Sequence, residues 1–127
     1  RPPHVLFVED EEYRNDKMVR FLQAHGFAVT IAGTVTDAIA AASAGGYGCV
    51  LLDVMLPELD GFETCRQIRA LNHGRVPIIM LTALDSDECR QRGFDAGADA
   101  YFTKPFNPDE VVSALHRLIQ ASRPPQI

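Results

Sequence analysis

The sequence has few cysteines, no long apolar run and no excess of positive charge, and each shortage excludes a class of protein. Its three cysteines, Cys49, Cys65 and Cys89, are widely spaced and form no CxxC pair, so they predict reduced intracellular thiols and neither a disulfide framework nor a zinc site. The apolar runs are far shorter than a membrane span. The formal net charge of −5 argues against non-specific binding to nucleic acid or to an anionic membrane. We therefore expect a cytoplasmic domain with no direct nucleic-acid or membrane partner.

What is present is typical of one folded domain. The chain has 127 residues, of which 46% are hydrophobic and 23% charged, and this is enough to bury a core without disulfides or structural metals. We expect the domain to span residues 4–121. The proline-bearing ends, residues 1–3 and 122–127, are typical of linkers and suggest a domain cut from a longer protein. Because the first residues lead straight into an apolar run, we expect no signal peptide.

Short apolar runs alternate with longer amphipathic stretches along the whole chain, and they predict strands and helices respectively. The expected strands are Val5–Val8, Phe27–Ile31, Val50–Asp53, Pro77–Leu81 and Tyr101–Thr103. The expected helices cover residues 12–25, Thr34 or Thr36 to Ala44, 62–71, 86–96 and a last stretch that begins at Pro108 after an Asn107 cap. Regular alternation of this kind predicts an α/β fold, with a five-stranded parallel sheet and helices on both of its faces.

Polar side chains follow four of the expected strands, at the point where each strand ends. They are Glu9, Asp10, Asp53, Thr82 and Lys104. Because the carboxyl ends of parallel strands meet at one edge of a sheet, we expect these groups to converge. Clustered carboxylates repel one another unless a cation neutralises them, and Mg²⁺ prefers such oxygen ligands and pairs readily with phosphate. Asp53, beside Mg²⁺ and a lysine, is therefore a candidate nucleophile toward a phosphoryl group.

Four segments in this order resemble the receiver domain of two-component response regulators. They are Glu9-Asp10, LLDVMLPELDG at 51–61, LTA at 81–83 and KPF at 104–106. The resemblance covers residues 5–121 and implies a flavodoxin-like (βα)5 fold with strand order 2-1-3-4-5. It also implies a histidine kinase or a histidine phosphotransfer domain as partner, and a switch that turns over no external substrate. The output that the switch controls is not named by the sequence.

The same resemblance assigns the residues of a phosphorylation site. It makes Asp53 the phosphoacceptor and a Mg²⁺ ligand, and Asp10 the direct ligand from the acidic pair. Glu9 assists the metal through water, and the backbone carbonyl of Met55 completes the protein's share of the ligands.

The resemblance further implies a switch that responds to the phosphoryl group. Thr82, Ala83 and Lys104 contact that group, and the peptide bond before Pro105 is cis. Thr82 moves toward the phosphate and the ring of Tyr101 turns inward, which changes the partners of the surface formed by the fourth helix, fifth strand and fifth helix. The oligomeric state, including a dimer formed on phosphorylation, is left open.

The chain departs from the common family pattern in three places. Glu9 stands where aspartate is more frequent, which should not abolish Mg²⁺ binding. Met55 and Leu84 are apolar at two positions thought to tune phosphate lifetime, so we expect slow self-dephosphorylation. The last helix, DEVVSALHRLIQ, lacks the Ala-Arg step typical of regulators that dimerise through this face and bind DNA.

Two other functions compete with this hypothesis. A phosphohydrolase with an aspartate nucleophile typically needs a second aspartate two residues later, where this chain has Met55. A binding module that has kept the fold but lost phosphorylation is the other alternative. Each residue of the set also has an ordinary structural explanation when taken alone, such as acids at a helix start. Their joint placement favours the phosphorylated switch.

Overall fold

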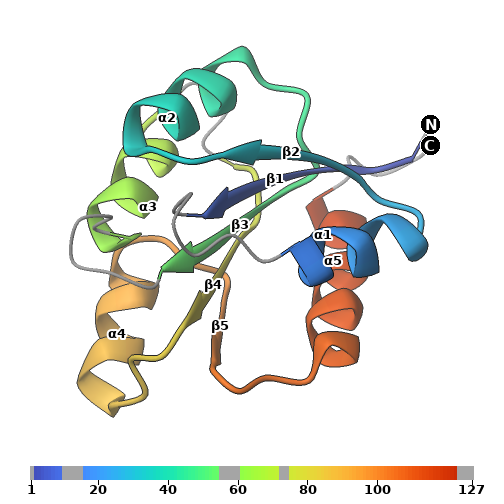
Figure 1. The fold of residues 1–127 in the computed structure, drawn as a ribbon. Helices are drawn as coiled ribbons and strands as arrows, with labels where there is room; N and C mark the ends of the chain where they lie inside the picture. The colour runs from blue at the N-terminus through green and yellow to red at the C-terminus, as the bar shows by residue number, and fades with distance from the viewer. Residues whose placement is uncertain (1, 10–15, 55–60, 72–74, 123–127) are drawn as a thin grey trace.

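The computed structural model describes residues 2–9, 16–54, 61–71 and 75–122, and in them the chain forms an open, twisted parallel sheet with helices on both faces (Figure 1). The strands are β1 (His4–Glu9), β2 (Ala28–Ala32), β3 (Cys49–Val54), β4 (Ile78–Thr82) and β5 (Ala100–Thr103). All neighbouring strands pair in parallel, in the order β2-β1-β3-β4-β5. The expected fold class and strand order are therefore confirmed.

Among the described residues, three helices start where a side chain caps free backbone N–H groups. They are α1 (Asp16–Ala24), α2 (Val35–Ala44), α3 (Gly61–Arg69), α4 (Asp87–Asp95) and α5 (Pro108–Ser122). Of the two threonines before α2, Thr34 is the cap, because its Oγ1 accepts the N–H of Asp37 at 3.0 Å. Ser86 caps α4 in the same way at 3.1 Å, and Asn107 Oδ1 accepts the N–H of Asp109 at 2.9 Å at the start of α5.

Within the described residues, the observed boundaries differ from the expected ones by one or two residues; the expected start of the first helix at residue 12 lies outside them. β4 begins at Ile78 and not at Pro77, because proline has no N–H for the ladder; its carbonyl still accepts the N–H of Val50 at 2.8 Å. α3 ends two residues before the expected Leu71. α5 continues through Ser122, the first residue of the range expected to be linker.

The sheet separates two layers of buried side chains. One layer packs between the sheet and α2, α3 and α4, and the other between the sheet and α1 and α5, as Figure 1 shows. Along β3 the side chains alternate between them: Val50 and Leu52 belong to the first layer, and Cys49 and Leu51 to the second. Strands buried on both faces are apolar throughout, which leaves the strand ends as the place for polar groups. Among the described residues no helix combines the length and hydropathy that a membrane span requires.

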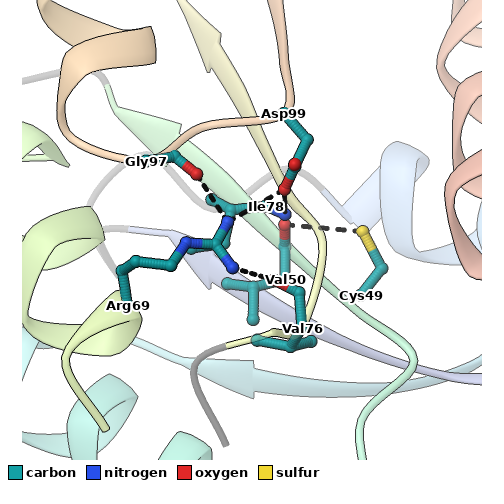
Figure 2. Close-up of polar contacts among 7 residues, drawn as sticks. All are labelled: Cys49, Val50, Arg69, Val76, Ile78, Gly97 and Asp99. Carbon is teal, nitrogen blue, oxygen red and sulfur yellow. Dashed lines mark hydrogen bonds and ion pairs between the residues drawn. The ribbon is translucent and has the colours of Figure 1, made fainter. Parts of the chain in front are cut away.

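Arg69 connects α3 to the amino-terminal ends of β4 and β5 (Figure 2). The guanidinium of Arg69 donates to the carbonyl of Val76 at 2.8 Å, to the carbonyl of Gly97 and to the Asp99 carboxylate at 2.9 Å. The same Asp99 oxygen also accepts the N–H of Ile78 at 2.8 Å. We call these five residues the Arg69 joint. It holds the turn between α4 and β5 against α3 through a planar, multidentate donor that lysine cannot imitate.

Gly97 is required by the geometry of this joint. Its φ of +114° lies in the region that other residues rarely adopt, and a Cβ built there would approach Arg69 Nε to 3.0 Å. The turn after α4 is therefore set by its backbone conformation and by its close contact with the arginine.

Candidate functional site

Asp53 and Glu9 lie side by side at the carboxyl edge of the sheet. They are register partners on β3 and β1, and only 2% and 1% of their surfaces are exposed. Removing two carboxylates from water is costly unless positive charge or hydrogen bonds compensate. Their burial beside one another therefore marks this edge as a polar site within an otherwise apolar sheet.

Lys104 brings an ammonium group to this edge. Its Nζ forms an ion pair with Asp53 Oδ1. Burial raises the pKa of the Asp53 carboxyl, and the hydrogen bond and charge of Lys104 offset part of that rise. The backbone of Lys104 is itself held, because its N–H donates to the carbonyl of Thr82 at 2.9 Å, and the peptide bond to Pro105 is cis.

Thr82 and Tyr101 both form hydrogen bonds with the backbone of Leu84. Thr82 ends β4, one register position beyond the residue paired with Asp53, and it is 1% exposed. Its Oγ1 accepts the N–H of Leu84 at 3.1 Å. The carbonyl of the same Leu84 accepts the hydroxyl of Tyr101 at 2.7 Å. A movement of Thr82 that breaks the first bond therefore removes one restraint on the Leu84 backbone, whose carbonyl accepts the second.

The ring of Tyr101 is already turned inward, with 6% of the residue exposed. It packs in the layer of α2, α3 and α4, and burial raises the pKa of its hydroxyl. The guanidinium carbon of Arg90 lies 5.3 Å from the ring centroid, and a Cβ on Gly93 would come within 2.8 Å of the ring. On the outer side, the ring centroid of Phe94 lies 6.3 Å away.

The described residues hold part of the expected site. Asp53, Glu9, Lys104 and Thr82 meet at one edge of the sheet, and Ala83 is exposed next to Thr82. Asp10 and Met55 lie outside the described residues, so their roles stay predictions. Within the ranges that the structure describes, no group of three metal-ligating side chains comes together.

The donor set nevertheless suits a hard divalent cation. Two buried carboxylates on adjacent strands offer oxygen ligands, and Mg²⁺ binds through one or two carboxylates while keeping several waters. One lysine ammonium beside two carboxylates leaves net negative charge at the edge, which a cation would offset.

Sequence reasoning missed the residues that hold the Tyr101 ring. Arg90 and Gly93 lie in α4, and they come close to the Tyr101 ring only when that helix packs on β5. One signal was present: a glycine inside a helical pattern is unfavourable, and it often marks close packing. No comparable signal identifies Arg90, because an arginine in a helix is usually solvated.

Comparison with known proteins agrees with this geometry. Residues 5–116 match the family model described as the response regulator receiver domain. An uncharacterized transcriptional regulatory protein, YkoG of Bacillus subtilis, is 42% identical over 121 residues, which cover 92% of this chain and 51% of that protein. The transcriptional regulatory protein SrrA of Staphylococcus aureus is 37% identical over 119 residues, covering 94% of this chain and 48% of that protein. The chain thus spans about half the length of these curated relatives.

Solved structures show the same fold with clear sequence similarity. The receiver domain of the sensor histidine kinase PA1611 from Pseudomonas aeruginosa, with a magnesium ion coordinated in its active-site cleft, superposes with a TM-score of 0.83 at 35% identity, covering 94% of this chain and 99% of that one. The BeF3-activated DrrB receiver domain gives a TM-score of 0.80 at 34% identity, with 94% and 99% covered. The carboxylate edge, the match over residues 5–116 and these relatives lead to one conclusion: the chain belongs to the response regulator receiver family.

Proposed function

We propose that the chain is a phosphorylation-controlled switch in which Asp53 accepts a phosphoryl group from a histidine kinase or a histidine phosphotransfer protein. The observation that carries the proposal is the ion pair between the buried Asp53 carboxylate and half-buried Lys104, with Glu9 in register beside Asp53. A purely structural carboxylate at a strand end would more often be solvated or used as a helix cap.

The transfer exchanges one bond to phosphorus for another. An oxygen of the ionised Asp53 carboxylate attacks the phosphorus of a phosphohistidine, the N–P bond breaks, and the electron pair returns to the imidazole. Lys104, already in contact with this carboxylate, offsets the charge that accumulates on the phosphoryl oxygens. Thr82 lies one strand away and supplies a hydroxyl that can donate to the new phosphate.

A Mg²⁺ ion fits the same edge. Asp53 would hold it directly and Glu9 through water, together with Asp10 and the carbonyl of Met55, which lie outside the described residues. When bound, the ion supplies positive charge beside the transferred oxygens and offsets the repulsion between the carboxylates.

The response travels along the Thr82–Leu84–Tyr101 connection. Thr82 has one hydroxyl hydrogen to donate, and turning it toward a phosphate disturbs the bond that its oxygen accepts from Leu84. The Leu84 carbonyl holds the Tyr101 hydroxyl, so the position of this ring and of α4 depends on the occupancy of Asp53. The exposed surface of α4, β5 and α5 changes as a result, and through this surface the switch controls its output.

The test is phosphorylation by a small donor. Incubation with acetyl phosphate and Mg²⁺ should add a phosphate-sized mass to the intact protein, and the adduct should be lost in Asp53→Asn and with excess EDTA. Asp37→Asn, which changes an exposed aspartate of α2, is the matched control and should behave as the wild type. An adduct that survives in Asp53→Asn, or its absence from the wild type with Mg²⁺, would contradict the proposal.

The lifetime of the phosphorylated form should be long. Leu84 offers an exposed apolar side chain where a polar group could orient the hydrolytic water. Leu84→Gln leaves the backbone bonds of that residue in place and should shorten the half-life of the adduct, measured by intact mass after removal of the donor. An equal half-life in the two proteins would exclude this role for position 84.

A further inference from the structure

A cavity opens at the amino-terminal edge of the sheet, at the other end of the strands from Asp53. It has a volume of about 360 Å³ and lies between the ends of α2 and α3 and the segments that lead into β3 and β4. This volume is at the lower end of the range of about 300–1,000 Å³ that small-molecule sites occupy. None of the described residues of the phosphorylation site lines it, so the proposed phosphotransfer leaves the cavity unexplained.

The interior of this cavity is largely apolar. Its lining includes apolar side chains from α2, from β3, from the end of α3 and from the approach to β4: Ala42, Val50, Ile68, Leu71, Val76 and Pro77. Val50 and Ile68 are buried in the core layer beneath α2 and α3, whereas Leu71 and Val76 are half-buried. The cavity therefore extends from solvent into that layer, and a ligand gains free energy by burying an apolar body there.

Contacts made outside the cavity hold its walls in place. At the approach to β4, Arg69 donates to the carbonyl of Val76 at 2.8 Å (Figure 2). At the approach to β3, the N–H of Gly48 donates to the carbonyl of His4 at 2.8 Å, and the His4 ring lies 4.7 Å from the ring of Tyr47. A site whose walls are already fixed loses less free energy to ordering when a ligand binds.

The charge of the lining comes from one arginine. Among the described residues that line the cavity, Arg75 alone is charged. It is exposed, and none of the ion pairs described in the structure includes it. Asp99, a carboxylate at the same edge of the sheet, is paired with Arg69 at 2.9 Å. The cavity thus combines an apolar interior with an uncompensated positive charge, and this combination is complementary to an amphipathic anion.

The helix ends beside the cavity act in the opposite sense. α2 ends at Ala44, and α5 ends at Ser122, which belongs to the lining; a helix carboxyl end carries roughly half a negative charge. The N–H of Gly45 donates to the carbonyl of Ala42 at 3.1 Å and so satisfies one free carbonyl of α2. The full charge of Arg75 exceeds the partial charge at either helix end, so the balance favours an anion. A cation of the same shape is the alternative that an experiment must distinguish.

We propose that this cavity binds a small amphipathic monoanion, whose apolar body packs between Ile68, Leu71 and Val76 and whose carboxylate pairs with the guanidinium of Arg75. The ligand class is a carboxylate with a short aliphatic or aromatic body. The proposal does not rest on phosphorylation of Asp53, because the cavity lies at the other end of the strands and shares none of its described residues with that site.

The test uses octanoate as the probe and octylamine as a cationic control with the same chain length. Titration of the intact, nitrogen-15-labelled chain should give saturable changes in the amide chemical shifts of Gly45, Gly46 and Gly48, which line the cavity. Octanoate should bind about tenfold more tightly than octylamine, because the ammonium group of octylamine meets Arg75 as a like charge.

Substitutions separate the charge of the site from its apolar interior. Arg75→Gln should weaken octanoate binding about tenfold, and the fold should tolerate it because Arg75 is exposed. Leu71→Ala should weaken the binding of octanoate about fivefold, because apolar lining is lost. Arg20→Gln is the matched control, since it removes an exposed arginine from α1, which covers the other face of the sheet. It should bind octanoate as the wild type does.

Three results would overturn the proposal. Chemical shifts that do not saturate, or that change over the whole surface equally, would show non-specific adsorption. Tighter binding of octylamine would assign the cavity to a cation held by the helix carbonyls. Equal weakening by Arg20→Gln and Arg75→Gln would show that overall charge, and not an ion pair with Arg75, attracts the anion. Intact mass after acetyl phosphate treatment reports on Asp53 separately, so either proposal can fail while the other stands.

Discussion

Replacing Gly93 by alanine tests whether the buried Tyr101 ring sets the position of α4. Alanine in a helix interior is normally favoured over glycine by about 1 kcal/mol. Here the added Cβ would lie 2.8 and 2.9 Å from two ring carbons of Tyr101 and 3.2 Å from the sulfur of Met80. Atoms cannot approach so closely, so either the ring or the helix must move.

The expected cost exceeds the gain in helix propensity. Overpacking a buried site typically costs about 1–3 kcal/mol. If the ring leaves its pocket, the hydrogen bond from Tyr101 to the Leu84 carbonyl is also lost, at about 1 kcal/mol. Since the lost hydrogen bond and the gain in helix propensity roughly cancel, we expect Gly93→Ala to lower the free energy of unfolding by about 1–3 kcal/mol and to expose the ring.

Urea denaturation and acrylamide quenching of tyrosine fluorescence measure these two effects. The chain has no tryptophan and three tyrosines, so a parallel series in a Tyr101→Phe background isolates the signal of this ring. Gly48→Ala is the matched control, because its Cβ would meet Ile119 at an ordinary 3.5 Å. If Gly93→Ala stabilised the protein by about 1 kcal/mol and left Tyr101 protected, α4 would not pack on this ring as described.

Four further experiments test other parts of the structure. Arg69→Lys keeps the charge but loses the forked donor, and we expect urea denaturation to show a loss of about 1–3 kcal/mol; an unchanged midpoint would show that the Arg69 joint adds no stability. Iodoacetamide at pH 8 should modify half-buried Cys89 before Cys65, because burial raises the pKa of Cys65 to about 11; peptide mass mapping that finds Cys65 alkylated first would contradict its burial. The same raised pKa should make stability fall from about pH 9 to 11, since the unfolded chain there releases a proton that the native chain keeps. Lys104→Met should destabilise the fold because it leaves the buried carboxylate of Asp53 without its ion pair, whereas Asp53→Asn should be neutral or stabilising; equal losses in urea denaturation would contradict this asymmetry.

The fold followed from local patterns because each pattern has a local cause. Apolar runs of strand length, separated by capped amphipathic helices, leave few arrangements other than a parallel sheet covered on both faces. The convergence of Asp53, Thr82 and Lys104 then follows from that topology alone, since each residue lies within one residue of the end of a strand.

Contacts that depend on how elements pack could not be predicted in this way. Arg69 lies in the last turn of its helix, where a cation is favourable for local reasons, and nothing nearby in the sequence indicates its bonds to Gly97 and Asp99, some 28 and 30 residues away. The inward ring of Tyr101 is similar, because its neighbours Gly93 and Arg90 meet it only after α4 packs on β5.

The division of the core by the sheet has a consequence for how this domain can diverge. Cys49 and Cys65 are both buried, yet they belong to opposite layers. The helices are divided in the same way, with α2, α3 and α4 on one face of the sheet and α1 and α5 on the other. Substitutions in separate layers share no packing partner, so their effects on stability should add. A lineage can therefore remodel α2, α3 and α4 for new neighbours without compensating changes beneath α1 and α5. Such changes in either layer should leave the edge that carries Asp53 in place, because the hydrogen-bonded backbone of the strands between the layers holds it.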